Sequence, residues 1–268
     1  MELKGASAVV TGAAGGIGAA VARRLIDRGA GTVVVTDLDG DRLQATADGL
    51  GTQAVAVVAD VTTTAGIELL LDALGGTPDL YVANAGIFRG FGLEATDDDW
   101  SAILDVNVMA HVRAARLLVP RWLERTEQGQ GGGCFAVTAS AAGLLTQLGS
   151  PTYATSKHAA VGFAEWLAAT YGDRGVQVAA LCPMGVRTPM TENGDVADGE
   201  AGVAHGSVSS AGDMMDPLDV ADALLDAIEG GRFLALPHEQ VGTMYAHKAA
   251  DPDRWIAGMQ RFRSSLES

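Results

Sequence analysis

Basic residues are scarce in this chain of 268 residues. Lysine and arginine together number 18 against 33 aspartates and glutamates, so the formal net charge at pH 7 is −15. A surface this acidic repels phosphate backbones, which argues against a nucleic-acid partner. We expect most of the carboxylates to form a solvated, solubilising surface. Lysine occurs only at Lys4, Lys157 and Lys248.

Cysteine occurs only as Cys134 and Cys182, each inside an apolar stretch and without a CxxC pair. This excludes a disulfide framework typical of small secreted proteins and predicts two buried free thiols. No apolar run approaches the roughly 18 residues of a membrane span, so no membrane partner is expected. A predicted strand begins at about Ser7, which leaves no room for a signal peptide. We therefore expect a cytoplasmic protein.

Metal-binding and hydrolase motifs are also missing. His238-Glu239 begins like a zinc-protease motif, but Gly242 stands where the second histidine should be. No Gly-x-Ser-x-Gly and no Gly-Lys-Ser/Thr of a P-loop occurs. We expect no metal site, and neither hydrolase nor nucleotide-hydrolysing chemistry.

Short apolar segments alternate with helix-length segments along the whole chain. The predicted strands are Ser7–Thr11, Thr32–Thr36, Gln53–Ala59, Leu80–Ala83, Cys134–Thr138, Gln177–Leu181 and Phe233–Leu236. The predicted helices include Gly18–Arg28, Gly66–Leu74, Asp98–Arg125, Tyr153–Tyr171 and Leu218–Glu229. Strands that are apolar throughout and separated by helices indicate a parallel sheet covered on both faces. The pattern predicts one α/β domain over residues 1–268, a doubly wound, Rossmann-type sheet of about seven strands.

A glycine-rich turn joins the first predicted strand to the first helix. Glycines at such a turn let the main chain approach a pyrophosphate at the helix N-terminus. Asp37 ends the second strand, where a carboxylate binds ribose hydroxyls and repels a 2′-phosphate. No Arg or Lys adjoins Asp37 or lies within the turn, which favours NAD over NADP; a solvated Asp37 in an ordinary turn is the alternative. The candidate cofactor residues of the turn are Gly12, Gly15, Gly16, Ile17 and Gly18.

Two segments near the expected site have less certain roles. Residues 189–216 follow the sixth strand and show no periodic apolar face; we interpret them as a substrate lid, with an ordinary surface loop as the alternative. Residues 237–268 predict a helical extension that covers the pocket or docks a neighbouring subunit. Methionines around the lid suit either a hydrophobic substrate or ordinary core packing.

Tyr153 and Lys157 are spaced four residues apart in a predicted helix, so both side chains lie on one face. A free tyrosine titrates near pH ~10, too high for efficient proton transfer at neutral pH. A nearby ammonium, together with a positively charged nicotinamide, is expected to lower the pKa of Tyr153. The pair predicts proton transfer beside a bound dinucleotide.

Several motifs in order resemble those of the short-chain dehydrogenase/reductase family, from about Gly5 to Thr188 and more weakly to Leu236. The Thr-Gly-x-x-x-Gly-x-Gly turn and the Tyr-x-x-x-Lys pair belong to this pattern. The other matching residues are Asp60, Val61, Asn84, Ala85, Gly86, Asn107, Ser140, Pro183, Val186 and Thr188. One departure is that Met184, not glycine, follows Pro183; it is expected to intrude on the substrate pocket.

The resemblance implies a role for each matching residue. Tyr153 would be the general acid or base and Lys157 would bind the nicotinamide ribose. Ser140 would orient the substrate oxygen, and Asn107 would hold a water of a proton relay. Asp60 and Val61 would contact adenine, Asn84-Ala85-Gly86 would line the cofactor cleft, and Pro183, Val186 and Thr188 would lie at the nicotinamide.

The predicted function is therefore NAD-dependent interconversion of a hydrophobic secondary alcohol and its ketone. The resemblance also suggests a homotetramer joined through the helices Asp98–Arg125 and Tyr153–Tyr171. Two alternatives stay open: an NADPH-dependent ketone reductase of the 3-oxoacyl type, and a non-catalytic dinucleotide sensor. Preference between the two cofactors separates the first alternative, and turnover of secondary alcohols separates the second.

Overall fold

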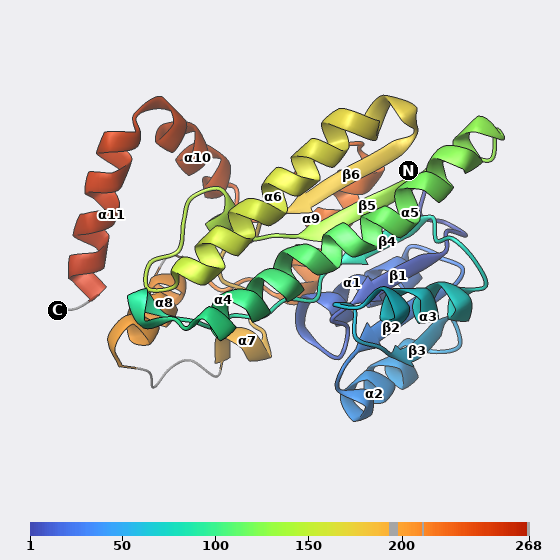
Figure 1. Cartoon of the computed structure of the whole chain (residues 1–268), viewed down its shortest axis with the longest axis horizontal. Helices are drawn as coiled ribbons and strands as arrows, with labels where there is room; N and C mark the ends of the chain where they lie inside the picture. The colour runs from blue at the N-terminus through green and yellow to red at the C-terminus, as the bar shows by residue number, and fades with distance from the viewer. Residues whose placement is uncertain (193–197, 211, 267–268) are drawn as a thin grey trace.

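The computed structural model describes residues 1–192, 198–210 and 212–266, and in them the strands form one sheet (Figure 1). All neighbours are parallel and the order is β3-β2-β1-β4-β5-β6-β7. The predicted parallel sheet of seven strands is confirmed. The strands are β1 (Ala8–Thr11), β2 (Val33–Asp37), β3 (Ala54–Val58), β4 (Leu80–Ala83), β5 (Gly133–Thr138), β6 (Val176–Leu181) and β7 (Leu234–Ala235).

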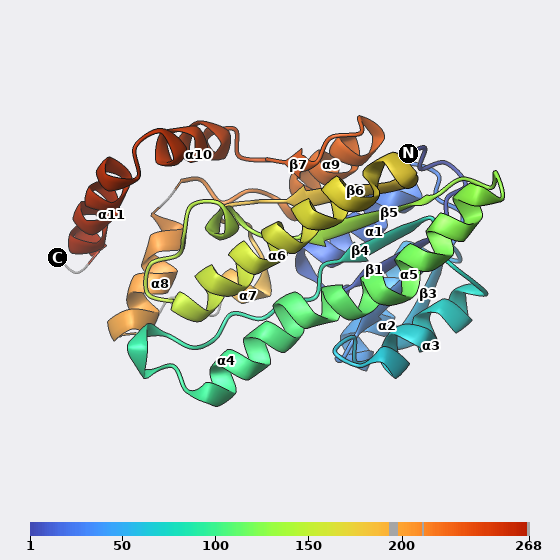
Figure 2. The same ribbon diagram turned by 45° about the horizontal axis from the view of Figure 1, so that its top comes forward.

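Helices cover both faces of the sheet (Figures 1 and 2). On one face lie α1 (Gly16–Asp27), α2 (Gly40–Leu50) and α9 (Pro217–Glu229). On the other face lie α3 (Thr64–Leu74), α5 (Ala110–Glu127) and α6 (Pro151–Tyr171). Successive strand residues point to opposite faces, so Val10 joins the core under α1 while its neighbour Val9 joins the core under α5. This is why apolar residues of the strands point to both faces of the sheet.

The long helix predicted over Asp98–Arg125 is divided in the structure. It consists of α4 (Asp97–Leu104), a π-helical turn (Asp105–Met109) and α5. A π turn inserts one extra residue into the helical ladder, and such turns often occur at functional sites. Here the turn contains Asn107, a predicted site residue.

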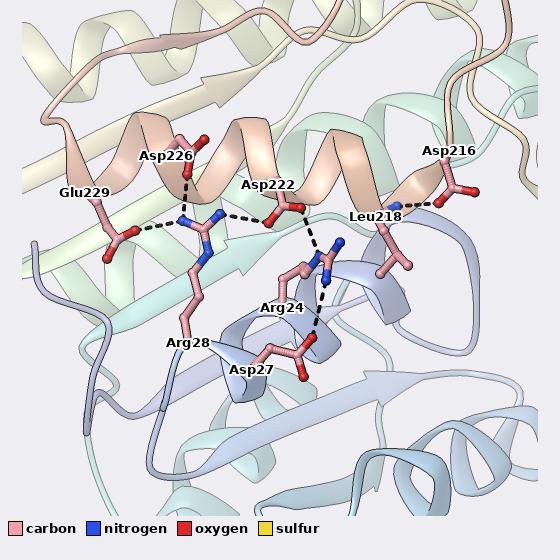
Figure 3. A network of polar contacts seen from close by, with 8 residues as sticks. All are labelled: Arg24, Asp27, Arg28, Asp216, Leu218, Asp222, Asp226 and Glu229. Carbon is pink, nitrogen blue, oxygen red and sulfur yellow. Dashed lines mark hydrogen bonds and ion pairs between the residues drawn. The ribbon is translucent and has the colours of Figure 1, made fainter.

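Arg24 of α1 and Arg28, the C-cap of this helix, tie α1 to α9 across the first face (Figure 3). The Arg28 guanidinium contacts Asp222, Asp226 and Glu229 at 2.7–2.8 Å. Arg24 pairs with the same Asp222 at 3.0 Å. The contacts spread three carboxylates of one helix over two cations, which offsets part of the acidic charge on this side of the sheet.

The remaining helices lie beyond the carboxyl ends of the strands. They are α7 (Pro189–Glu192), α8 (Gly199–Ser209), α10 (Gln240–Ala250) and α11 (Pro252–Leu266). The segment 189–216, which lacked apolar periodicity, thus contains two helices; its residues 193–197 and 211 lie outside the described residues. Helix α11 extends from the body of the molecule and runs beside α8 (Figures 1 and 2). No helix among the described residues is long and apolar enough to cross a membrane.

The strand order reverses direction at β1, which lies between β2 and β4. In open parallel sheets, ligands bind in the crevice that such a reversal opens at the carboxyl ends of the strands. Apart from Asn107 in the π turn, the predicted site residues follow a strand at this edge or lie at the beginning of the helix after it. The fold therefore brings together residues that are up to 176 positions apart, from Gly12 to Thr188.

Candidate active site

The glycine turn after β1 permits close backbone contacts that a side chain would block. Gly12 has φ of +64°, and a Cβ there would lie 2.8 Å from the Ala85 Cα. A Cβ on Gly18 would lie 2.2 Å from the Gly12 carbonyl oxygen. Only glycine fits these positions without shifting the backbone. The turn is thereby held against the residues after β4, with the N-terminus of α1 open to the groove.

Thr11 and Asn84 fix the distance between these two segments. The Thr11 Oγ1 accepts hydrogen bonds from the backbone N–H groups of Asn84 and Ala85, each at 2.9 Å. The Asn84 side chain donates to the carbonyls of Thr11 at 2.9 Å and Gly12 at 3.1 Å. These four bonds form the floor of a groove of about 310 Å³.

Asp37 and Arg42 lie together at one end of this groove. The Asp37 carboxylate accepts hydrogen bonds from the backbone N–H of Ala14 at 3.1 Å and of Leu38 at 2.8 Å. The Arg42 Nη2 lies 3.0 Å from the position of a Cβ on Gly15. The predicted preference for NAD rests on the absence of Arg and Lys next to Asp37 and within the glycine turn. Arg42 is outside both of these segments and was not included. Arg42 belongs to the first turn of α2, which is capped by Asp39, and this helix places the arginine beside the glycine-rich segment after β1.

Most predicted cofactor residues line this groove. They are Gly12, Gly15, Gly16, Ile17, Asp37, Asn84, Ala85, Gly86, Tyr153, Lys157, Pro183, Val186 and Thr188. Gly18 lies beneath the turn, and Asp60 and Val61 are outside the lining. The Asp60 carboxylate instead accepts hydrogen bonds from the backbone N–H and the hydroxyl of Thr62. The adenine contacts of Asp60 and Val61 stay a prediction.

Tyr153 and Lys157 project from the first turns of α6, which begins with Pro151 after the N-cap Ser150. The Lys157 Nζ lies 5.5 Å from the centre of the Tyr153 ring and donates a hydrogen bond to the Thr138 carbonyl at 2.9 Å. Thr138 ends β5, and Ser140 follows it. Ser140 lines the same groove as Tyr153 and Lys157. The structure thus brings the three predicted side chains to one point.

Burial dominates the acid–base properties of this pair. It raises the pKa of the Tyr153 hydroxyl, and the Ser140 side chain opposes this rise. It also lowers the pKa of Lys157 to about 8. The sequence predicted a lowered pKa for Tyr153 from Lys157 together with a bound nicotinamide, and for that state it stays a prediction. In the protein alone burial prevails, because a phenolate in an apolar surrounding loses hydration energy.

Asn107 is fully buried and serves as a brace between two segments. Its Oδ1 accepts a hydrogen bond from the Ile87 N–H at 2.8 Å. Its Nδ2 donates to the Ile87 carbonyl and to the Ser156 Oγ, each at 3.0 Å. Both amide hydrogens of Asn107 therefore donate to protein groups. The predicted contact of Asn107 to a water would have to use another atom of this residue.

A second cavity of about 430 Å³ adjoins the groove, and the two share Ser140, Tyr153, Met184, Met190 and Thr191. Tyr153 thus lies where the groove meets this cavity. Met184 lines both cavities, as expected from its departure from the family pattern. The C-terminal helices contribute Met244, Trp255, Met259 and Phe262 to the wall of the second cavity. The C-terminal extension therefore lines this cavity within a single chain. Whether it covers a substrate pocket or docks a neighbouring subunit stays a prediction.

Two histidines near the second cavity were not predicted as site residues. His205 of α8 lines the cavity and packs edge-on against Phe88, which itself packs edge-on against Tyr153. The His238 Nδ1 accepts a hydrogen bond from the Met184 N–H at 3.2 Å, and burial lowers the pKa of this imidazole. His238 follows β7 and thereby holds the turn that contains Met184. Among the described residues, no three His, Cys, Asp or Glu side chains are grouped to hold a metal ion.

Known proteins resemble this chain over most of its length. A family model described as short chain dehydrogenase matches residues 6–197. A 1-deoxy-11-beta-hydroxypentalenate dehydrogenase of Streptomyces avermitilis is 36% identical over 266 residues, which cover 96% of this chain and 93% of the relative. The oxidoreductase UcpA of Escherichia coli is 31% identical and covers 97% of this chain and 93% of its own length.

The solved structures agree. A short chain dehydrogenase/reductase of Burkholderia phymatum in complex with NAD has a TM-score of 0.83 at 29% identity, covering 94% of this chain and 96% of that chain. This likeness extends over the sheet and both helical layers.

Proposed function

The chain belongs to the short-chain dehydrogenase/reductase family, and from this premise we propose that it oxidises a hydrophobic secondary alcohol with NAD⁺, or reduces the corresponding ketone with NADH. The single observation that carries the proposal is the position of the Tyr153 hydroxyl, where the groove and the apolar cavity meet. A group that exchanges a proton with a substrate oxygen must reach both sites.

The bound dinucleotide would supply the hydride acceptor in the oxidative direction. The Tyr153 oxygen takes the hydroxyl proton of the alcohol, and Ser140 donates a hydrogen bond that orients the substrate oxygen. Lys157 binds the nicotinamide ribose and, with the charge of the ring, opposes the effect of burial on the pKa of Tyr153. Asn107 keeps the segment after β4 at its distance from α6. The balance is one alcohol and NAD⁺ converted to one ketone, NADH and one proton.

NAD is proposed as the cofactor because the Asp37 carboxylate lies under the glycine turn, where it would bind the ribose hydroxyls and repel a 2′-phosphate. The relative from Burkholderia phymatum was solved with NAD. We further propose that the enzyme acts in the cytoplasm as a homotetramer joined through α5 and α6. The test is NADH formation, followed at 340 nm, with a panel of secondary alcohols. Absence of turnover with NAD⁺ and NADP⁺ alike would refute the proposal in favour of a dinucleotide sensor.

One observation favours the second candidate, an NADPH-dependent ketone reductase. Arg42 lines the same end of the groove as Asp37, and a guanidinium there would bind a 2′-phosphate. We expect Asp37→Ala to improve kcat/KM for NADP⁺ at least tenfold, and Arg42→Ala to leave kcat/KM for NAD⁺ within a factor of three. If wild type prefers NADP⁺ and Arg42→Ala abolishes that preference, the second candidate replaces the first.

A further inference from the structure

The wall of the 430 Å³ cavity is apolar around most of its circumference. Its volume lies within the range of about 300–1,000 Å³ that holds small-molecule ligands. The loop after β5 contributes Leu145 and Leu148, and α8 contributes Val208. Met190 and Met214 close one side, and Met259 of α11 closes another. Polar groups of the lining include Ser140 and Tyr153 at the groove, and Gln147, His205 and Ser207 beside α8.

No lysine or arginine lines this cavity among the described residues. The sequence agrees, because none occurs anywhere between Arg187 and Arg232, a stretch that includes the whole predicted lid. The same stretch carries several carboxylates, among them Glu200, Asp213 and Asp216. Among the described lining residues, His205 is the one side chain that can carry a positive charge, so a substrate carboxylate would find no lysine or arginine to pair with. An unpaired charge in an apolar site is strongly disfavoured.

Three cations outside the cavity lining are bound to other groups. The Arg187 guanidinium contacts Asp216 at 3.2 Å. The Lys248 Nζ donates to the Leu144 carbonyl at 2.7 Å and lines an adjoining hollow, which shares Trp255 and Met259 with the cavity. Arg263 makes two contacts with the Glu200 carboxylate, at 2.6 and 3.0 Å.

The Arg263–Glu200 pair has a consequence for the shape of the cavity. It joins α11 to α8, and the Leu266 side chain lies 3.7 Å from the position of a Cβ on Gly206. Trp255 and Phe262 of α11 are thereby held over the cavity. Their aromatic surface extends the apolar wall beyond the region lined by the sheet loops.

On the strength of the proposed function, we infer that the substrate is an uncharged, bulky alcohol or ketone with an apolar ring system, and that substrates bearing a carboxylate are rejected. The relative from Streptomyces avermitilis is named for a pentalenate, which is a carboxylate. The aromatic surface of α11 covers the ring system, while Ser140 and Tyr153 engage the reacting oxygen.

The test compares decahydro-2-naphthol with 6-hydroxydecahydronaphthalene-2-carboxylate at pH 8. We expect kcat/KM to be at least tenfold higher for the neutral alcohol. Met259→Arg places a cation in the cavity wall and should raise kcat/KM for the carboxylate at least tenfold. Ser264→Arg adds the same charge to α11 on an exposed position outside the cavity and should leave the ratio unchanged.

Binding of both compounds to the NAD-loaded protein, measured by calorimetry, separates this inference from the proposed function. If neither compound is oxidised but the neutral one binds at least tenfold more tightly, the substrate class stands and the oxidoreductase proposal fails. If the carboxylate is oxidised or bound as well as the neutral alcohol, the inference is overturned while the activity stands. Equal gains from Met259→Arg and Ser264→Arg would also overturn it, because the effect would then be one of net charge alone.

Discussion

Replacing Thr11 by valine is expected to lower the free energy of unfolding by about 2 kcal/mol and to weaken dinucleotide binding. Thr11 is 2% exposed, and valine keeps its shape while removing the Oγ1 that accepts two backbone hydrogen bonds. The Asn84 N–H retains the Val82 carbonyl as an acceptor at 3.0 Å. The Ala85 N–H loses its acceptor; an unpaired buried donor costs about 1–3 kcal/mol, and Ala85 is half-buried at the groove.

Thr36→Val is a matched control for this substitution. Thr36 lies opposite Thr11 in the register of β1 and β2 and is fully buried, yet its hydroxyl has no hydrogen-bond partner among the described residues. Removing it should be neutral or slightly stabilising. Urea unfolding followed by circular dichroism gives both free energies, and fluorescence titration gives the affinity for NAD. An equal effect of the two substitutions would refute the assigned role of the Thr11 oxygen.

Three further substitutions test other parts of the structure. Tyr153→Phe should lower kcat by a factor of about 10²–10⁴ with the Kd for NAD nearly unchanged, since it removes a general acid–base group; undiminished kcat would contradict this. Arg28→Met should cost about 1–2 kcal/mol in urea unfolding at low salt, and much of that difference should vanish in 1 M salt because the contacts to α9 are partly exposed. His111→Leu should flatten the loss of stability in acid: burial lowers the pKa of His111 to about 3, below the ordinary 6.5, so the unfolded chain takes up a proton that the folded chain refuses. Wild type should therefore lose about 1.4 kcal/mol per pH unit more than the variant as pH falls from 6.5 toward 3, and parallel curves would contradict this.

Features that depend on local chain chemistry were predictable from the sequence. The strands are mostly apolar on both faces because helices cover both faces of the sheet, so their number and parallel arrangement followed from the pattern alone. The glycine turn, Asp37 and the Tyr153–Lys157 pair each adjoin a strand end or a helix start. Once the sheet is parallel, these positions must converge on one edge. That convergence required no knowledge of side-chain packing.

Features that depend on contacts between distant segments were not predictable in the same way. The position of Arg42 could not be predicted, because this residue lies beside the glycine turn only once α2 has formed and packed there. The π turn contains Asn107, whose side chain makes two hydrogen bonds with the Ile87 backbone. Hydrophobic periodicity carries no information on such bonds. Helix α8 has no apolar periodicity of its own, and its position is fixed by α11 and the Arg263–Glu200 pair. The effect of burial on the pKa of Tyr153 likewise needs the packed environment.

The strongly acidic chain must still attract an anionic dinucleotide, and the helix termini explain how. Helix α4 carries Asp97, Asp98 and Asp99 in its first turn, and its N-terminus is capped by Thr96. Helix α1 has no acidic residue in its first turn, and its N-cap Gly15 makes no side-chain capping bond. Its free N–H groups and dipole are therefore left for a pyrophosphate. At physiological ionic strength remote carboxylates are screened beyond about 8 Å, so this short-range contact outweighs the net charge of −15.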